Sequence, residues 1–193
     1  GADVSVAILD EAARIDLNAA PPTLLAGLFE ELGEPRERAT RLAAAIVDWR
    51  DPNNLSQPVG GAEDPAYASA GLAWGAKDAP FDSVAELAQV LGMRPALVAS
   101  AVPHLTVYSG NAAPNANIAS PVVLAAMGLQ PRTAPIDPDA PLASPGSGTY
   151  SMVARATLPN GAWTGLEVTV RLGGAGVSGL AYTVLRWQDG ETL

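Results

Sequence analysis

The stretch DEAARIDLNAAPPTLLAGLFEELG, residues 10–33, contains the change of pattern that decides the fold. Polar and apolar residues alternate with period two from Arg14 to Asn18, which is typical of a strand. From Pro21 onward, leucine and phenylalanine recur at helical spacing, and Gly33 ends the run. The sequence therefore predicts a β region that gives way to helices near residue 18.

The apolar run Val4–Leu9 precedes this stretch, and we expect it to form a hairpin with Arg14–Asn18. Strand patterns return only late in the chain, at residues 150–158, 166–172 and 180–187. Because a single hairpin is only marginally stable, we expect it to join these late strands in one antiparallel sheet. The sequence thus predicts an α+β fold in which a helical domain is inserted into the sheet.

The region between the two groups of strands carries helix patterns. Helices are predicted from Pro21 to Gly33, over 36–49, from a Ser83–Glu86 capping box to Gly92, over 95–105, and from Ser120 to Gly128. The polar stretch 51–79 is too long for an ordinary connection, so it is either functional or held by a ligand. The predicted organisation is a first part of the β scaffold at 1–18, an inserted helical domain at 19–128, a Pro-rich connector at 129–148 and the second part of the scaffold at 149–193.

Composition excludes several classes of function. Twenty acidic and 11 basic residues give a net charge of -9, which opposes non-specific binding to nucleic acid or to an anionic membrane surface. There is no cysteine, hence no thiolate nucleophile and no Cys-ligated zinc. His104 is the only histidine and no nucleophile motif lies near it, so we interpret it as structural and expect no enzyme activity.

Four motif segments resemble those of the type II secretion minor pseudopilin K family. The first is the run from Asp10 to Pro22, in which Ala13 stands where the family usually has Gly and Ala19 where it often has Thr. The other segments follow in the family's order: Asp48-Trp49-Arg50-Asp51 with Gly60-Gly61-Ala62-Glu63-Asp64 and Tyr67; Phe81 to Leu87, continued by Gly92-Met93 and His104 to Tyr108; and Asn115 to Pro121.

The resemblance implies a pseudopilin fold, with a membrane-spanning helix ahead of these residues, a small sheet and an inserted helical domain. It implies a structural tip subunit of the type II secretion pseudopilus, which helps to export folded proteins across the outer membrane. Expected partners are the I-type and J-type minor pseudopilins. The expected location is the periplasm of a Gram-negative bacterium, with anchoring in the inner membrane only through that preceding helix.

The densest group of candidate oxygen ligands surrounds the start of the long polar stretch: Asp48, Asp51, Asn53, Glu63 and Asp64. Calcium takes about six to eight oxygen ligands from flexible loops of this kind. The resemblance implies calcium in the helical domain, and we expect calcium to raise the melting temperature. In the alternative interpretation these carboxylates cap the helix that ends at Trp49 and face the solvent, and asparagine at 53 and 54 lowers the local charge.

A nucleic-acid-binding helix-hairpin-helix module is the alternative to the secretion role. The helix pairs around Gly33 and Gly92 are similar to modules that grip a phosphate with backbone N–H groups. Each turn has only one glycine, however, and residues 19–128 hold 11 acids and 6 bases, a balance of -5. The charge therefore disfavours this alternative.

Overall fold

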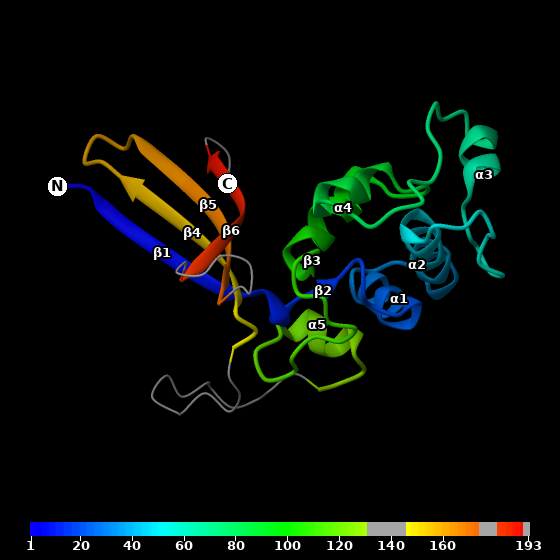
Figure 1. The fold of residues 1–193 in the computed structure, drawn as a ribbon, viewed down its shortest axis with the longest axis horizontal. Helices are drawn as coiled ribbons and strands as arrows, with labels where there is room; N and C mark the ends of the chain where they lie inside the picture. The colour runs from blue at the N-terminus through cyan, green and yellow to red at the C-terminus, as the bar shows by residue number, and fades with distance from the viewer. Residues whose placement is uncertain (131–145, 174–180, 191–193) are drawn as a thin grey trace. The chain divides into compact units, whose positions relative to one another are not determined.

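The computed structural model describes residues 1–130, 146–173 and 181–190. The chain forms two compact units, one of residues 1–12 with 141–193 and one of residues 13–140 (Figure 1). The predicted connector at 129–148 falls mainly on residues 131–145, which lie outside the described residues.

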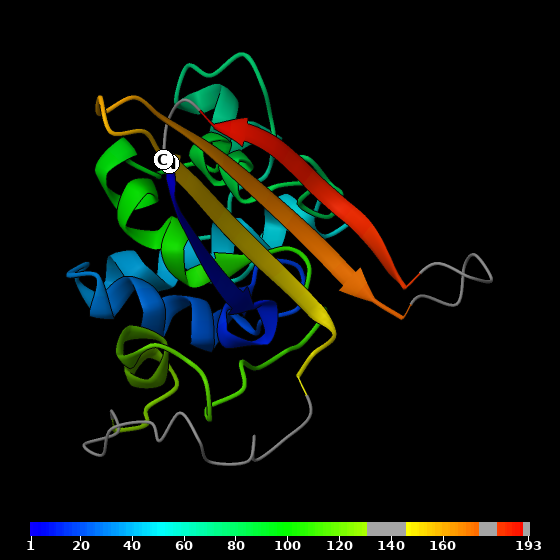
Figure 2. The ribbon, with the colours of Figure 1, turned by 90° about the vertical axis from the view of Figure 1, so that its left-hand side faces the viewer.

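The first unit is a four-stranded antiparallel sheet in the order β1-β4-β5-β6 (Figure 2). Its strands are β1 (Asp3–Asp10), β4 (Thr149–Thr157), β5 (Trp163–Leu172) and β6 (Tyr182–Gly190). β1 pairs with β4 along its whole length, from Asp3 opposite Thr157 to Asp10 opposite Tyr150. The expected antiparallel pairing between the start of the chain and its last strands is confirmed.

One face of this sheet is apolar and exposed. Directly opposed residues share a face, so the pairings place Val4, Val6 and Ile8 on the same face as Met152 and Trp187. Val4 is 67% exposed, Ile8 65% and Trp187 60%. The other face is polar, and there the buried Ser151 hydroxyl hydrogen bonds to Glu11 and lies 2.9 Å from the Thr169 hydroxyl.

The predicted hairpin between Val4–Leu9 and Arg14–Asn18 is wrong. Ile15 and Asp16 form β2, which pairs in parallel with β3 (Leu105–Thr106) in a separate two-stranded sheet. Ile15 and Leu17 are fully buried in the core of the second unit. Residues 13–18 therefore belong with the helices rather than with the β scaffold, because their apolar side chains are buried there.

The second unit is helical. It contains α1 (Pro22–Glu31), α2 (Arg36–Arg50), α3 (Asp64–Ser69), α4 (Pro95–Ala101) and α5 (Pro121–Ala126), with short 3₁₀ helices η2 (Val84–Gln89) and η3 (Val102–His104). A further 3₁₀ turn, η1 (Glu11–Ala13), follows β1. The predicted positions of α1, α2, α4 and α5 are confirmed, whereas α3 lies within the long polar stretch and was not predicted. Among the described helices, none combines the length and apolarity that crossing a membrane requires.

Small residues let the helices pack closely. α1 contributes Leu25, Leu28 and Phe29 to the core, each fully buried. A Cβ at Gly27 of α1 would lie 2.5 Å from the carbonyl oxygen of Ala126 in α5, so only glycine permits this approach. The core of the second unit is thus built from helices with many small side chains, which pack closely, as the alanine-rich composition indicates.

Candidate functional site

Motif segments that are far apart in the sequence meet in the second unit. The β2–β3 pairing joins the first segment to the segment that ends at Tyr108, and Leu17 extends it by donating its N–H to the Thr106 carbonyl oxygen at 2.8 Å. The Asp16 carboxylate is buried and accepts hydrogen bonds from Gly110 N–H at 2.7 Å and Ser109 Oγ at 3.1 Å. These motif residues therefore hold the segment at 15–17 against the segment at 105–110.

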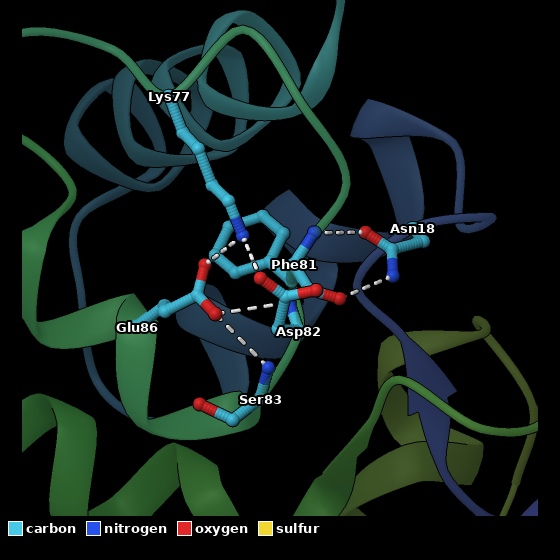
Figure 3. A network of polar contacts seen from close by, with 6 residues as sticks. All are labelled: Asn18, Lys77, Phe81, Asp82, Ser83 and Glu86. Carbon is cyan, nitrogen blue, oxygen red and sulfur yellow. Dashed lines mark hydrogen bonds and ion pairs between the residues drawn. The ribbon is translucent and has the colours of Figure 1, made fainter.

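The Asn18 side chain joins the first segment to the third (Figure 3). Its Oδ1 accepts a hydrogen bond from the Phe81 N–H at 2.7 Å, and its Nδ2 donates to the Phe81 carbonyl oxygen at 2.9 Å. This reciprocal pair fixes the end of the long polar stretch against β2. Asn18 therefore acts as a structural clamp.

Replacing Asn18 by alanine is expected to lower the free energy of unfolding by about 1–3 kcal/mol, because two half-buried backbone groups lose their partner. Asn18→Asp keeps the acceptor and should fall between the alanine variant and the parent. Urea unfolding measures the effect, with exposed Asn111→Ala as the control. An Asn18→Ala protein as stable as the Asn111→Ala protein would contradict the clamp.

Lys77 continues the same network (Figure 3). Its Nζ lies 2.6 Å from Asp82 Oδ2 and 2.8 Å from Glu86 Oε2. The other oxygen of Glu86 accepts the N–H groups of Asp82 at 2.9 Å and Ser83 at 3.1 Å, so the predicted capping box is confirmed, although it begins a 3₁₀ helix. These contacts order the chain immediately after the long polar stretch.

The segment Asp48–Asp51 at the end of α2 holds two loops. The Arg50 guanidinium donates to the carbonyl oxygen of Leu17 and, at 2.7 Å, to that of Ala20. Trp49 is buried, and its ring centroid lies 6.2 Å from that of Tyr67 and 6.1 Å from that of Phe81. Two motif segments, the second and the third, therefore share one aromatic cluster.

Asp48, a predicted cation ligand, is fully buried and already has partners. Its carboxylate accepts the N–H of Ala62 at 2.6 Å and that of Gln57 at 3.1 Å. Burial raises the pKa of Asp48 above its ordinary value, while these two N–H groups lower it in part. Asp48 thus folds the 57–62 loop back onto α2.

Glu63 differs from Asp48, because its Oε1 is buried and has no hydrogen-bond partner. Glu63 as a whole is only 4% exposed to solvent. The pKa of Glu63 is raised to about 7, mainly by burial and in addition by the negative charges of Asp48 and then Asp78. A buried carboxylate oxygen without a donor is the kind of group that a cation stabilises.

Asp78 is the acidic residue of this region that the sequence analysis missed. Its Oδ1 is also buried without a hydrogen-bond partner. The backbone φ of Asp78 is 53°, a value that residues other than glycine rarely adopt. It lies at the far end of the same long stretch. An aspartate within the polar stretch 51–79 is visible in the sequence, but the predicted ligands were all taken from residues 48–64.

The remaining predicted ligands have local partners. Asp51 Oδ1 accepts from the Asn53 N–H at 3.1 Å and from its Nδ2 at 2.7 Å, and Asn53 Oδ1 accepts the Leu55 N–H at 2.9 Å. Asp64 Oδ1 accepts the Ala76 N–H at 3.1 Å. In residues 1–130, 146–173 and 181–190, no three histidine, cysteine, aspartate or glutamate side chains lie close enough together to form a metal cluster by themselves.

His104 lies beside the first turn of α5. Its Nδ1 is 3.4 Å from Ser120 Oγ, and that hydroxyl accepts the Val123 N–H at 3.3 Å as the helix cap. Burial lowers the pKa of His104, and the positive charge of Arg14 lowers it further. These contacts support the structural interpretation of this histidine.

The two glycine turns of the helix-hairpin-helix alternative are tied to each other. The N–H groups of Gly33 and Glu34 both donate to carbonyl oxygens of α1 at 2.9 Å. The buried Glu34 carboxylate pairs with Arg38, at 2.8 Å, and with Arg94 of the second turn, while Arg38 also donates to the Gly92 carbonyl oxygen at 2.9 Å. The first turn's N–H groups are thus already used, and the nucleic-acid alternative has no support.

The small antiparallel sheet and the separate helical unit agree with the pseudopilin class of fold that the motif resemblance implies. The family model for protein K of the type II secretion system matches residues 7–110. The chain therefore belongs to the type II secretion system protein K family.

A solved structure supports the same fold. The chain is similar to a chain in the crystal structure of the GspK–GspI–GspJ complex from the enterotoxigenic Escherichia coli type 2 secretion system. The TM-score is 0.71 at 20% sequence identity, and the match covers 98% of this chain and 80% of that chain. A comparison with curated protein sequences gives no match.

Proposed function

We propose that this chain is a structural subunit at the tip of the type II secretion pseudopilus and that it has no catalytic role. Its membership of the protein K family carries this proposal. The polar motif residues support it, because Asn18, Asp48 and Arg50 are engaged with backbone groups rather than gathered around a substrate. The role is then mechanical, in the export of folded proteins across the outer membrane.

A secretion assay tests this role in cells. In the source bacterium, deleting the gene should leave type II substrates in the periplasm, and the intact gene should restore their export. A plasmid copy that carries Trp49→Ala should restore it less, because Trp49 packs against both Tyr67 and Phe81. Normal export after deletion would contradict the proposal.

The partners we propose are the I-type and J-type minor pseudopilins. The support is the similar solved structure, which is a complex of GspK with GspI and GspJ. We also propose that the described units lie in the periplasm and that a preceding helix anchors the protein in the inner membrane. In the same proposal the helical unit is a domain inserted into the sheet.

The apolar face of the sheet supports a covering helix. Val4, Val6 and Ile8 are each more than half exposed on one face, and burying them would remove a large apolar area from water. We propose that the preceding hydrophobic helix lies against this face and thereby fixes the described units to the pseudopilus.

Val6→Asp is expected to change the free energy of unfolding of the 193-residue chain by about 0.5 kcal/mol or less, because Val6 is exposed in this chain. In the membrane-anchored protein the same change should impair export, since it places a charge under the helix. Ala7→Asp, on the opposite face of β1, is the matched control. Equal export by the two variants would contradict the covering helix.

We further propose that the long polar stretch binds calcium. The support is the pair of buried, unpartnered oxygens, Glu63 Oε1 and Asp78 Oδ1, and the raised pKa of Glu63, which results mainly from burial and then from repulsion by neighbouring carboxylates. Backbone carbonyl oxygens and waters commonly complete calcium sites that have few carboxylates. Glu63 and Asp78 would hold the ion together with such carbonyl oxygens and waters. The ion would neutralise the repulsion between the two carboxylates and tie together the two ends of the stretch.

A further inference from the structure

A groove runs along α2 between this helix and the loop 57–62. It consists of three hollows of about 450, 380 and 310 Å³. The first two share Arg36, Thr40 and Val59, and the second and third share Arg41 and Gly60. We call this continuous surface the α2 groove.

Two unpaired arginines mark the middle of the α2 groove. Arg36 and Arg41 are exposed, and within the described part of the chain neither guanidinium has a hydrogen-bond or ion-pair partner. Every other described basic side chain has a partner: Arg38 and Arg94 pair with Glu34, Lys77 with Asp82 and Glu86, and Arg50 with backbone carbonyls; Arg155 stacks on Trp163, Arg171 contacts Thr149, Arg186 pairs with Glu167, and Arg14 also interacts.

Arg36 and Arg41 lack partners although the chain has a net charge of -9 and therefore many acids that could pair with them. The Asp48 bonds that fold the loop back onto α2 also form the wall of the groove. A Cβ at Gly60 or Gly61 would collide with Arg41 or with Asp48, so these glycines keep the loop close to the helix. The wall of the groove is therefore held by the fold itself.

The end of the groove nearest α1 is mainly apolar. Its lining includes Pro22, Ala26, Ala44 and Pro58, with Val59 as an exposed aliphatic side chain at 65%. An occupant that fits the whole groove carries carboxylates beside aliphatic side chains. Two acids also line the groove, Glu30 at this end and Glu37 in the middle hollow, and both would repel carboxylates placed beside them.

We propose that the α2 groove binds an extended acidic peptide segment of a partner protein, with carboxylates at Arg36 and Arg41 and an aliphatic side chain near Val59. Arginine suits this role because its planar guanidinium can hold a carboxylate through two parallel hydrogen bonds. Three arginines, Arg36, Arg38 and Arg41, and two glutamates, Glu30 and Glu37, line the groove, so its balance is +1 while the chain as a whole carries -9. This difference in sign favours acidic segments at this surface. The inference goes beyond the proposed function and does not depend on it.

Fluorescence anisotropy with a labelled peptide of alternating aspartate and leucine tests the proposal on the full chain. The Arg36→Gln/Arg41→Gln double variant is expected to bind about tenfold more weakly than the parent, which corresponds to about 1.4 kcal/mol. Glu37→Gln should bind more tightly than the parent. Arg155→Gln removes the same charge from the sheet and should leave the affinity unchanged.

The peptide and the conditions supply the other controls. A matched asparagine–leucine peptide should bind at least about tenfold more weakly, and binding of the acidic peptide should weaken as salt rises. Circular dichroism melting checks that the variants are folded, as expected for exposed arginines without partners. Equal binding of the two peptides, unchanged binding by the double variant, or tighter binding of inorganic phosphate or duplex DNA than of the acidic peptide would overturn the proposal.

Discussion

The Glu63→Gln variant is expected to be more stable than the parent in chelator and to lose the stabilisation that calcium gives the parent. In the metal-free parent, a nearly buried carboxylate faces other acids and one of its oxygens has no donor. Replacing it with a neutral amide should raise the free energy of unfolding by about 1–2 kcal/mol, because it removes charge from a poorly solvated place. The same change removes a ligand of the proposed calcium site.

The calcium effect on the parent should be large. Calcium at about 100 times its dissociation constant stabilises a native protein by about 2.7 kcal/mol, which raises the melting temperature of a chain this size by about 5–10 °C. Asp78→Asn should behave as Glu63→Gln does, since both carry an unpartnered oxygen.

Thermal melting at a pH above 7, with calcium and with chelator, measures both effects. Glu31→Gln, an exposed acid on α1, is the matched control and should keep the full calcium response. A calcium response in Glu63→Gln as large as in the parent would show that the ion binds elsewhere. Identical melting curves of the parent with calcium and with chelator would remove the calcium proposal altogether.

The second large effect is expected at Trp49, where alanine should lower the free energy of unfolding by about 3–5 kcal/mol. Trp49 is 3% exposed and packs between Tyr67 of α3 and Phe81 of the third motif segment. Truncation leaves a cavity where α2, α3 and the chain at Phe81 meet. The helices are rich in small residues and have few other large side chains that could fill it.

Trp49→Phe separates packing from hydrogen bonding at this position. The indole Nε1 of Trp49 is buried without a partner, so phenylalanine loses volume but also removes an unsatisfied donor. We expect a cost of about 1 kcal/mol or less. Urea unfolding measures both variants, and a Trp49→Phe cost close to that of Trp49→Ala would show that the Nε1 group matters to stability after all.

The sequence was sufficient to predict features that depend on neighbouring residues. Proline at the first turn and glycine beyond the last locate α1, and the Ser83–Glu86 spacing locates the capping box. The late strands were predicted because polar and apolar residues alternate within each strand, which is also a pattern of neighbouring residues. In each case the residues that make the contact lie within a few positions of one another.

Features that depend on distant partners were predicted less well. The alternation from Arg14 to Asn18 correctly indicates extended backbone, but it does not identify β3 as the partner of β2. The hairpin was the nearest arrangement in sequence and was wrong for that reason. Trp74 and Phe81 look alike in the sequence, yet Trp74 is 48% exposed and Phe81 is 3% exposed.

The candidate cation residues show the same division. The five predicted residues are grouped in sequence, but only Glu63 is left with an unpartnered buried oxygen, while Asp48, Asp51 and Asp64 accept N–H groups of nearby loops. Asp78 joins Glu63 only because the chain folds back through α3 and the Lys77 network. The course of the chain between Glu63 and Asp78 depends on contacts between residues that are distant in sequence, and such contacts cannot be predicted from a local sequence pattern.

Light scattering of a mixture of this chain with the soluble regions of the I-type and J-type pseudopilins from the same secretion system measures whether the three chains assemble. We expect a single species whose mass is the sum of one copy of each chain. Elution of this chain by itself, while the other two bind each other, would contradict it.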